Sequence, residues 1–231
     1  MIRLLHFALY GVASLLIGIG VLTAFGRTEI TSSINELINR EPDNNRTVIN
    51  GQWPPRVGLR YPDLLLTDQN GDQVALSDFA GKVILLELAA IPCKGCQAFA
   101  GGNKYGGFDG IGVQKGLDSI HEYAQRFAGV TLGENEQVVF VQLLLYGKDM
   151  SSPSQDDVSH WAAHFKMKRD RNQIVLRGDN SMLGQTTYEM IPGFHLIDRD
   201  FTLRCDSSGH HPKQDLFRDL LPQLGQFARP D

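Results

Sequence analysis

The chain has 231 residues, of which 42% are hydrophobic, a composition ordinary for one globular domain with extensions. Its formal net charge of -4 gives no general attraction to nucleic acid or to anionic lipid, and no basic stripe with interleaved aromatic residues is present. We therefore do not expect nucleic acid as a partner.

The N-terminus has the composition of a membrane segment. Residues 4–25 carry no charge, and about 20 apolar residues are enough to cross a bilayer as a helix. We predict an uncleaved anchor over residues 1–26. A cleaved signal peptide is the alternative, because Ala24-Phe25-Gly26 resembles a cleavage site with small residues. Arg3 favours a cytoplasmic N-terminus and an exported body, although Arg27 weakens that bias.

Residues 27–55 are predicted to form a polar tether. Polar side chains dominate residues 41–46, and Trp53-Pro54-Pro55 ends the segment with stiff, non-helical backbone. A short helix is expected over residues 32–37.

The next segments predict a hairpin followed by a crossover unit. Two short apolar stretches flank the turn dipeptide Asn70-Gly71, which is typical of a β-hairpin. Residues 83–91 and 138–146 are almost continuously apolar, as expected for strands covered on both faces. Between these strands, apolar residues recur at helical spacing and predict a helix in a right-handed βαβ unit: Val113, Leu117, Ile120, Ala124 and Phe127.

The C-terminal half predicts one more helix and strand, then two strands and a last helix. Ser152 is expected to cap the first of these helices, with Pro153 at its first position. A short strand follows at residues 173–176. Residues 193–198 and 201–205 are expected to pair antiparallel, and apolar residues from Leu216 to Leu224 mark the terminal helix.

Two cysteines lie directly after the first apolar strand, in Cys93-Lys94-Gly95-Cys96. A strand that delivers two thiols onto the first turn of a helix places the first sulfur where a thiolate is stabilised. Zinc sites also use this spacing, but they normally need a second pair of soft ligands. The only other cysteine is the distant Cys205, so the spacing favours dithiol chemistry, with no metal and no cofactor.

A glycine-rich segment follows the two cysteines. Residues 101–112 contain six glycines, and each glycine disfavours helix by up to about 1 kcal/mol relative to alanine. The helix after the cysteines should therefore be interrupted by a loop beside the dithiol. Tyr105 and Phe108 in this loop are predicted to help bind a partner, and a pliable insertion is the equal alternative. The GK[ST] ending of a phosphate-binding loop is missing.

The order of these elements resembles the thioredoxin fold, and more closely the membrane-anchored extracytoplasmic proteins of the TlpA and ResA type, whose core is shared with peroxiredoxins. Four stretches carry the resemblance: residues 61–64 with Asn70-Gly71, 76–83, 92–96 and 191–198. The resemblance implies an α/β domain over residues 56–231, with three α/β/α layers and a mixed central sheet, behind an N-terminal transmembrane helix. It also implies a single-pass protein of the bacterial inner membrane, with its catalytic domain in the periplasm or extracytoplasmic space.

The family's roles can be carried over onto the cysteine motif and the late proline. The resemblance implies that Cys93 is the nucleophile, that Cys96 resolves the mixed disulfide to form a Cys93–Cys96 disulfide, and that a cis Pro192 shapes the substrate groove. Ile191, Lys94 and Gly95 are then expected to line that groove. Only a thiolate attacks, so Cys93 beside Lys94 should have a lowered pKa, whereas the deeper Cys96 needs a proton acceptor.

Glu87 is the candidate acceptor, because it occupies the place where thioredoxin keeps a buried aspartate. The alternative is that Glu87 points to a solvated edge. An unpaired carboxylate is costly to bury within so apolar a strand, and that cost favours a functional role.

The sequence also departs from the family. Pro92 precedes Cys93 where a tryptophan is frequent, and Ala90 stands where peroxiredoxins place threonine or serine. The second difference disfavours a peroxiredoxin-like thiol peroxidase. A copper-binding assembly factor of the Sco-like kind is a further alternative, but such proteins carry CxxxC and a histidine. Candidate metal-binding histidines are His195, His210 and His211.

The leading hypothesis is a thiol-disulfide oxidoreductase that exchanges disulfides with exported, cysteine-containing proteins and receives electrons from an upstream redox donor. A bland alternative is an interaction protein whose cysteine pair forms a structural disulfide. Cys205 is expected to be an unreactive strand residue.

Overall fold

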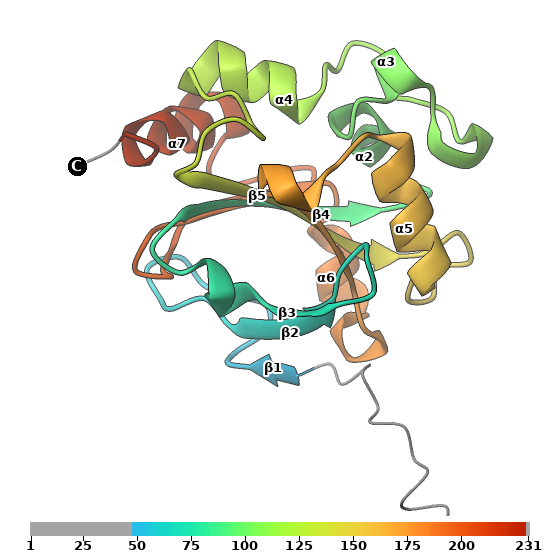
Figure 1. Ribbon diagram of the computed structural model, residues 1–231, viewed down its shortest axis with the longest axis horizontal. Coiled ribbons are helices and arrows are strands. Elements are labelled where there is room, and N and C mark those ends of the chain that lie inside the picture. The colour runs from blue at the N-terminus through green and yellow to red at the C-terminus, as the bar shows by residue number, and fades with distance from the viewer. Residues whose placement is uncertain (1–47, 230–231) are drawn as a thin grey trace, which may run out of the picture. The chain divides into compact units, whose positions relative to one another are not determined.

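The computed structural model describes residues 48–229 (Figure 1). The predicted anchor at residues 1–26, the short helix at 32–37 and most of the predicted tether lie outside the described residues. Within residues 48–229, no helix combines the length and the apolar character that a bilayer crossing requires.

A five-stranded mixed sheet forms the centre of the domain, with strand order β6-β5-β4-β7-β8. The strands β4, β5 and β6 are parallel, β7 pairs antiparallel with β4, and β8 pairs antiparallel with β7 at the edge of the sheet. Every residue of β4 and β5 is buried, as their continuous apolar sequences predict. The bounds are β4 (Val83–Ala90), β5 (Val138–Tyr146), β6 (Gln173–Arg177), β7 (Gly193–Ile197) and β8 (Leu203–Ser208).

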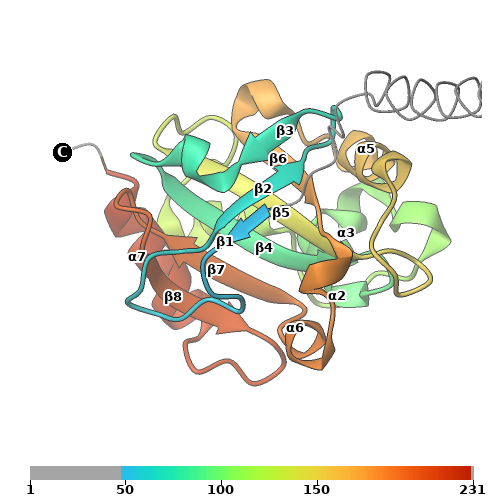
Figure 2. The ribbon, with the colours of Figure 1, turned by 90° about the horizontal axis from the view of Figure 1, so that it is seen from below.

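Helices cover one face of this sheet, and a second sheet covers the other (Figures 1 and 2). The helical face carries α2 (Lys94–Phe99), α4 (Ile120–Tyr123), α5 (Gln155–His164) and α7 (Leu221–Phe227). The opposite face carries an antiparallel sheet with the short α6 beside it: β1 (Val48–Asn50), β2 (Asp63–Thr67), β3 (Gln73–Ala75) and α6 (Gln185–Glu189). The α/β/α prediction therefore holds for the helical face, while the other outer layer is mainly a sheet.

Strands β2 and β3 form the predicted hairpin, and a third strand that was not predicted adds to it. β1 pairs with β2 from the segment predicted to be tether, so residues from Val48 onward belong to the folded domain. Farther along this segment, the indole Nε1 of Trp53 donates to Thr187 Oγ1 of α6 at 3.0 Å. Leu64 and Leu66 of β2 are completely buried in the core of the domain, whereas Leu65 between them is partly exposed.

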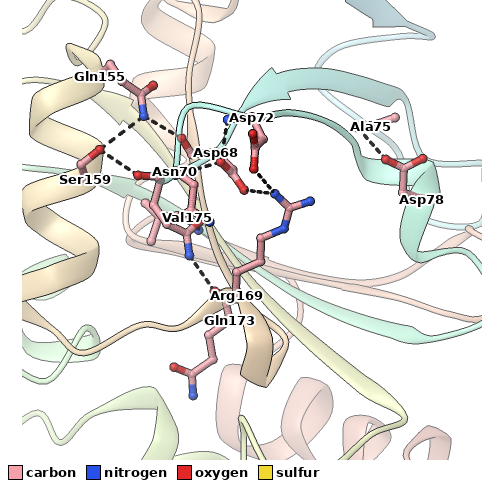
Figure 3. A network of polar contacts seen from close by, with 11 residues as sticks. Asp68, Asn70, Asp72, Ala75, Asp78, Gln155, Ser159, Arg169, Gln173 and Val175 are labelled. Carbon is pink, nitrogen blue, oxygen red and sulfur yellow. Dashed lines mark hydrogen bonds and ion pairs between the residues drawn. The ribbon is translucent and has the colours of Figure 1, made fainter.

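A carboxylate at the hairpin turn ties this outer sheet to the helical side (Figure 3). Asp68 is fully buried, and its Oδ1 accepts from the backbone N–H groups of Asn70 (2.8 Å) and Asp72 (3.0 Å). Its Oδ2 accepts from Arg169 Nη1 at 2.6 Å. The backbone carbonyl of Asp68 accepts from Gln155 Nε2 of α5 at 2.7 Å, so every acceptor atom of Asp68 has a partner.

The crossover helix starts later than the apolar spacing predicts. Residues 111–118 are irregular, because Gly110 and Gly116 adopt φ angles of 74° and 82°, which lie outside the helical region. Ser119 then caps α4 with its side chain, and Glu122 completes the capping box. The prediction that the helix after the cysteines is interrupted is confirmed, since α2 ends at Phe99. The loop also contains a one-turn helix, α3 (Gly102–Tyr105).

One helix starts at a different residue from the one that the sequence predicts, and another helix was not predicted. Ser154 rather than Ser152 caps α5, and its Oγ accepts from the N–H of Asp157 at 3.1 Å. The helix α6 was not predicted, because residues 185–189 carry no apolar stripe. Short 3-10 or π turns complete the fold: η1 (Leu76–Phe79), η2 (Phe108–Gly110), η3 (Ala124–Ala128), η4 (Arg169–Arg171), η5 (Asn180–Met182) and η6 (Leu216–Leu220).

Candidate active site

Cys93 is the residue at which strand β4 passes into helix α2. It occupies the N-cap position with extended backbone (φ -78°, ψ 113°), and its Sγ accepts from the N–H of Cys96 at 3.2 Å. A sulfur at this position replaces the oxygen that usually satisfies a free N–H of the first helical turn. The side chain is half-buried, so one side of the sulfur is open to solvent.

The surroundings of Cys93 stabilise its thiolate. The pKa of Cys93 is lowered from 9.0 to about 7, chiefly by the hydrogen bond with the Cys96 thiol. The backbone N–H groups of Cys96 and Gly95 lower it further, and burial acts in the opposite direction. A pKa near 7 makes about half of this thiol nucleophilic at neutral pH. The lowering of the pKa was predicted from the sequence, but it comes from hydrogen bonds of Cys96 and of the backbone rather than from the charge of Lys94.

Cys96 has the opposite character. Its side chain is fully buried, and burial together with the negative charges of Cys93 and Glu87 raises the pKa of Cys96 well above its ordinary value. The two thiols are not joined to each other in the structure. Cys96 therefore needs a proton acceptor before it can act as a nucleophile.

Glu87 lies beneath this pair, in the middle of β4, and it is fully buried. The alternative of a solvated edge is therefore wrong. Burial, assisted by the charge of Cys93, raises the pKa of Glu87 from 4.5 to about 8, and a hydrogen bond from Gln142 opposes this rise. Gln142 Nε2 donates to Oε2 at 2.7 Å, whereas Oε1 has no hydrogen-bond partner among the described residues.

Gln142 and Trp161 continue this network, although neither was assigned to the site from the sequence. Gln142 lies beside Glu87 in the parallel register of β4 and β5, and its Oε1 accepts from Trp161 Nε1 at 2.9 Å. A signal was available, because Gln142 is an amide within an otherwise apolar strand. Aligning the two buried strands by their polar residues would have paired Gln142 with Glu87.

The Ile191–Pro192 peptide faces the cysteines from the start of β7. It is cis, which confirms the expectation drawn from the resemblance. Gly95 allows close approach here, since a Cβ atom on it would lie 3.3 Å from Pro192 Cγ and 3.2 Å from Gln114 Oε1. The lack of a side chain at Gly95 thus lets the proline loop lie against the first turn of α2.

An open groove of about 720 Å³ runs past Cys93. Besides Cys93, its lining residues include four that the sequence analysis assigned to substrate binding or catalysis, namely Lys94, Gly95, Ile191 and Pro192. It also exposes residues that the sequence analysis did not assign to it: Gln114, Met150, Tyr188, Glu189, His210 and His211. Tyr188 and Met150 are 52% and 42% exposed, so they give the lining of the groove an exposed apolar part.

The two aromatic residues of the glycine-rich loop lie elsewhere. Tyr105 is 37% exposed but borders a separate hollow with Lys104 and His121. Phe108 is only 5% exposed and packs edge-on against Trp161, with ring centroids 5.4 Å apart. The prediction that Phe108 contacts a partner is therefore corrected, because its buried ring anchors the loop to α5.

The three candidate metal-binding histidines and the third cysteine lie in different surroundings. His195 is buried in β7, with Nδ1 2.8 Å from the Tyr61 hydroxyl oxygen and Nε2 3.4 Å from Asp206 Oδ1. His210 and His211 are exposed in the groove. No group of three or more His, Cys, Asp or Glu residues is arranged for a metal ion within residues 48–229. Burial and nearby carboxylates raise the pKa of Cys205 to about 12, as suits an unreactive thiol.

Comparisons with known proteins were made by sequence and by structure. No family model matches the chain, and no curated protein matches it. A solved structure named as a protein disulfide isomerase from Bacteroides thetaiotaomicron matches with a TM-score of 0.51 and 16% identity, over 79% of this chain and 96% of that one.

Two further solved structures match at lower scores. The thioredoxin domain of a thiol-disulfide oxidoreductase from Bacteroides vulgatus has a TM-score of 0.46 and 13% identity, over 75% of this chain and 99% of that one. A thiol:disulfide interchange protein from Chlorobium tepidum has a TM-score of 0.47 and 19% identity, over 75% and 98%. The likeness to the Bacteroides thetaiotaomicron structure, together with the mixed central sheet and its helical face, shows that residues 48–229 have a thioredoxin-like fold.

Proposed function

We propose that this chain is a thiol-disulfide oxidoreductase in which Cys93 attacks a substrate disulfide and Cys96 resolves the intermediate. The observation that carries the proposal is the contrast between the two thiols. Cys93 is half-exposed with a pKa of about 7, whereas Cys96 is buried and protonated above an acidic side chain. A structural disulfide would need neither this difference in acidity nor an open groove.

The reaction starts with the Cys93 thiolate. Its sulfur attacks one sulfur of a substrate disulfide, forms a mixed disulfide and releases the other substrate sulfur as a thiolate. Cys96 then transfers its proton to Glu87, and the new thiolate attacks Sγ of Cys93. The second substrate sulfur leaves as a thiolate and takes a proton from solvent. The protein dithiol loses two electrons, the substrate disulfide gains them, and all steps are reversible.

The groove beside Cys93 suits a polypeptide substrate. Its exposed apolar residues Tyr188 and Met150 can cover side chains next to the substrate cysteine, and Pro192 lines the same groove. Buried apolar contacts of this kind contribute affinity without requiring one sequence. We propose that the substrates are cysteine-containing exported proteins and that an upstream redox donor restores the dithiol.

The location of the domain follows from the apolar N-terminal segment. A membrane anchor over residues 1–26 would tether the domain outside the cytosol, in the periplasm of a bacterium, where protein disulfides persist. Protease treatment of intact spheroplasts tests this location. Digestion of the domain supports it, and protection of the domain contradicts it.

Cysteine variants of the full-length chain test the reaction. Cys93→Ser should abolish reduction of a disulfide-bonded model protein such as insulin, because no other accessible thiolate replaces Cys93. Cys96→Ser should accumulate a covalent mixed disulfide that dithiothreitol releases. Cys205→Ala is the matched control, since this thiol is buried away from the pair, and should retain activity. Undiminished turnover in Cys93→Ser would refute the proposed function.

A further inference from the structure

A buried amide connects Glu87 to the indole of Trp161. Gln142 Nε2 donates to Glu87 Oε2 at 2.7 Å, and Gln142 Oε1 accepts from Trp161 Nε1 at 2.9 Å. All three side chains are fully buried, and they come from β4, β5 and α5. No water is needed to complete either hydrogen bond.

The indole determines which way the amide faces. An indole N–H can only donate, so the Gln142 atom next to Trp161 must be the carbonyl oxygen. The NH₂ group of Gln142 then has to face Glu87. In the reverse orientation, two donors would meet at Trp161 and two acceptors would meet at a carboxylate, and both contacts would be lost.

The amide bonds to only one carboxyl oxygen. Oε2 of Glu87 is occupied by Gln142, and Oε1 is buried without a hydrogen-bond partner among the described residues. An orphaned buried oxygen is expensive in a structural carboxyl group. An oxygen without a hydrogen-bond partner is, however, free to accept a proton from a neighbouring thiol.

We propose that Gln142 and Trp161 are positioning residues that hold Glu87 with Oε1 free to take the Cys96 proton during resolution of the mixed disulfide. This inference rests on the proposed function. Trp161 acts through Gln142, and neither residue touches the substrate.

Among the groups that surround Glu87, Gln142, which is held by Trp161, makes the main polar contact with its carboxyl group. Helix α2 contributes the two titratable neighbours, Cys93 and Cys96, whose electrostatic effects act on Glu87 or depend on it. Strand β5 contributes Gln142, α5 contributes Trp161, and β7 places the apolar Phe194 opposite Glu87. No cation is among these groups, so the amide hydrogen bond is the interaction that favours the ionised carboxyl.

Formation of the mixed disulfide at Cys93 makes Glu87 a better proton acceptor. Once Cys93 is in a mixed disulfide, its sulfur carries no charge and no longer raises the pKa of Glu87. The carboxyl group then ionises more readily at the stage when Cys96 must lose its proton. The amide hydrogen bond persists through this change, because it involves neither cysteine.

A two-step colour reaction separates attack from resolution. The reduced full-length chain, kept in detergent because of its apolar N-terminal segment, is mixed rapidly with an equimolar amount of 5,5′-dithiobis(2-nitrobenzoate). Attack by Cys93 releases one thionitrobenzoate, and resolution by Cys96 releases the second. The first phase reports on the proposed function, and the pH dependence of the second phase reports on Glu87.

Two variants remove the positioning hydrogen bonds. Gln142→Met should raise the midpoint pH of the second phase by about one unit and slow this phase about tenfold at neutral pH, because it removes a hydrogen bond to the ionised carboxyl group. Trp161→Phe leaves the amide free to rotate, so a smaller rise and a roughly threefold slowing are expected. In both variants the rate should recover at high pH, which a merely structural defect would not produce.

Trp53→Phe is the matched control, since it deletes the other indole N–H of the chain, which donates to Thr187 of α6. Its second-phase midpoint should equal that of the wild type. In a Glu87→Gln background, Gln142→Met should no longer shift the midpoint. An unshifted midpoint in whichever positioning variants fold, with a normal first phase, would overturn this inference and leave the proposed function intact. A wild type without a fast first phase would overturn both.

Discussion

Two buried carboxyl groups in this domain have opposite surroundings. Asp68 at the hairpin turn receives two backbone N–H groups and a guanidinium, as Figure 3 shows. Glu87 beneath the cysteines receives one amide and no cation, and one of its oxygens has no partner among the described residues. Both are completely buried, so burial alone does not distinguish them.

The two carboxyl groups differ in whether one of their oxygens remains without a partner and can accept a proton. Asp68 has its oxygens engaged and serves to fasten the outer sheet to the rest of the domain. Glu87 is held in a state in which protonation is favourable, beside a thiol that must lose a proton. An incompletely satisfied carboxyl group near a reactive sulfur thus marks chemistry, and a fully satisfied one marks architecture.

The largest expected effect is a pH dependence of stability that originates from Glu87. The folded pKa of Glu87 is raised from 4.5 to about 8, so the folded state binds this proton more tightly than the unfolded state does. The stabilisation of the folded state by protonated Glu87 is fully present below the pKa of Glu87 in the unfolded chain, and it is lost as the pH rises toward 8. The free energy of unfolding of the reduced chain should fall by roughly 3 kcal/mol between pH 5 and pH 8 from this group.

Urea unfolding at several pH values measures this slope, and Glu87→Gln should remove most of it. A slope in the variant equal to that of the wild type would show that Glu87 is not the group responsible. Asp68→Asn serves as a comparison, because it should lower stability without removing the part of the slope that comes from Glu87.

A smaller loss is expected when the satisfied carboxyl group is deleted. Asp68→Ala leaves two N–H groups without their acceptor and leaves Arg169 with Asp72 as its remaining carboxylate partner, and the free energy of unfolding at pH 7 should fall by about 2 kcal/mol. Arg169 is 38% exposed, so solvent replaces part of the ion pair and limits the loss. The rates of both thionitrobenzoate phases should stay unchanged. A selective slowing of the second phase would connect the hairpin turn to the chemistry and break the contrast with Glu87.

The sequence predicted the parts of the fold that depend on continuous or alternating patterns. The strands that became β4 and β5 were recognisable because every residue in them is buried, and the pairing of β7 with β8 followed from two short apolar runs close together. The crossover helix was predicted too early, since its apolar spacing continued through residues whose glycines adopt positive φ angles. Apolar spacing is blind to this backbone requirement.

The site was predictable where the chemistry depends on residues close in sequence. Cys93 and Cys96 lie on one turn at the start of α2, and Glu87 precedes them on strand β4, which leads into that turn. Gln142 and Trp161 were missed because their roles arise from strand register and helix packing, which join residues 55 and 19 positions apart. Phe108 was misassigned because an aromatic ring in a polar loop has the same appearance in sequence whether it faces a partner or the core.

The smallest expected effect concerns the first thiol and tests how far the charge of Glu87 extends. Iodoacetamide should alkylate Cys93 with a midpoint near pH 7, as its hydrogen bonds to Cys96 and to backbone N–H groups require. In Glu87→Gln the midpoint should fall by less than about half a pH unit, because Glu87 is mostly protonated at that pH and exerts little charge. Asp68→Asn should leave the midpoint unchanged. A fall of a full unit in Glu87→Gln would mean that Glu87 is ionised at neutral pH, and the distinction between the two buried carboxyl groups would then rest on their partners alone.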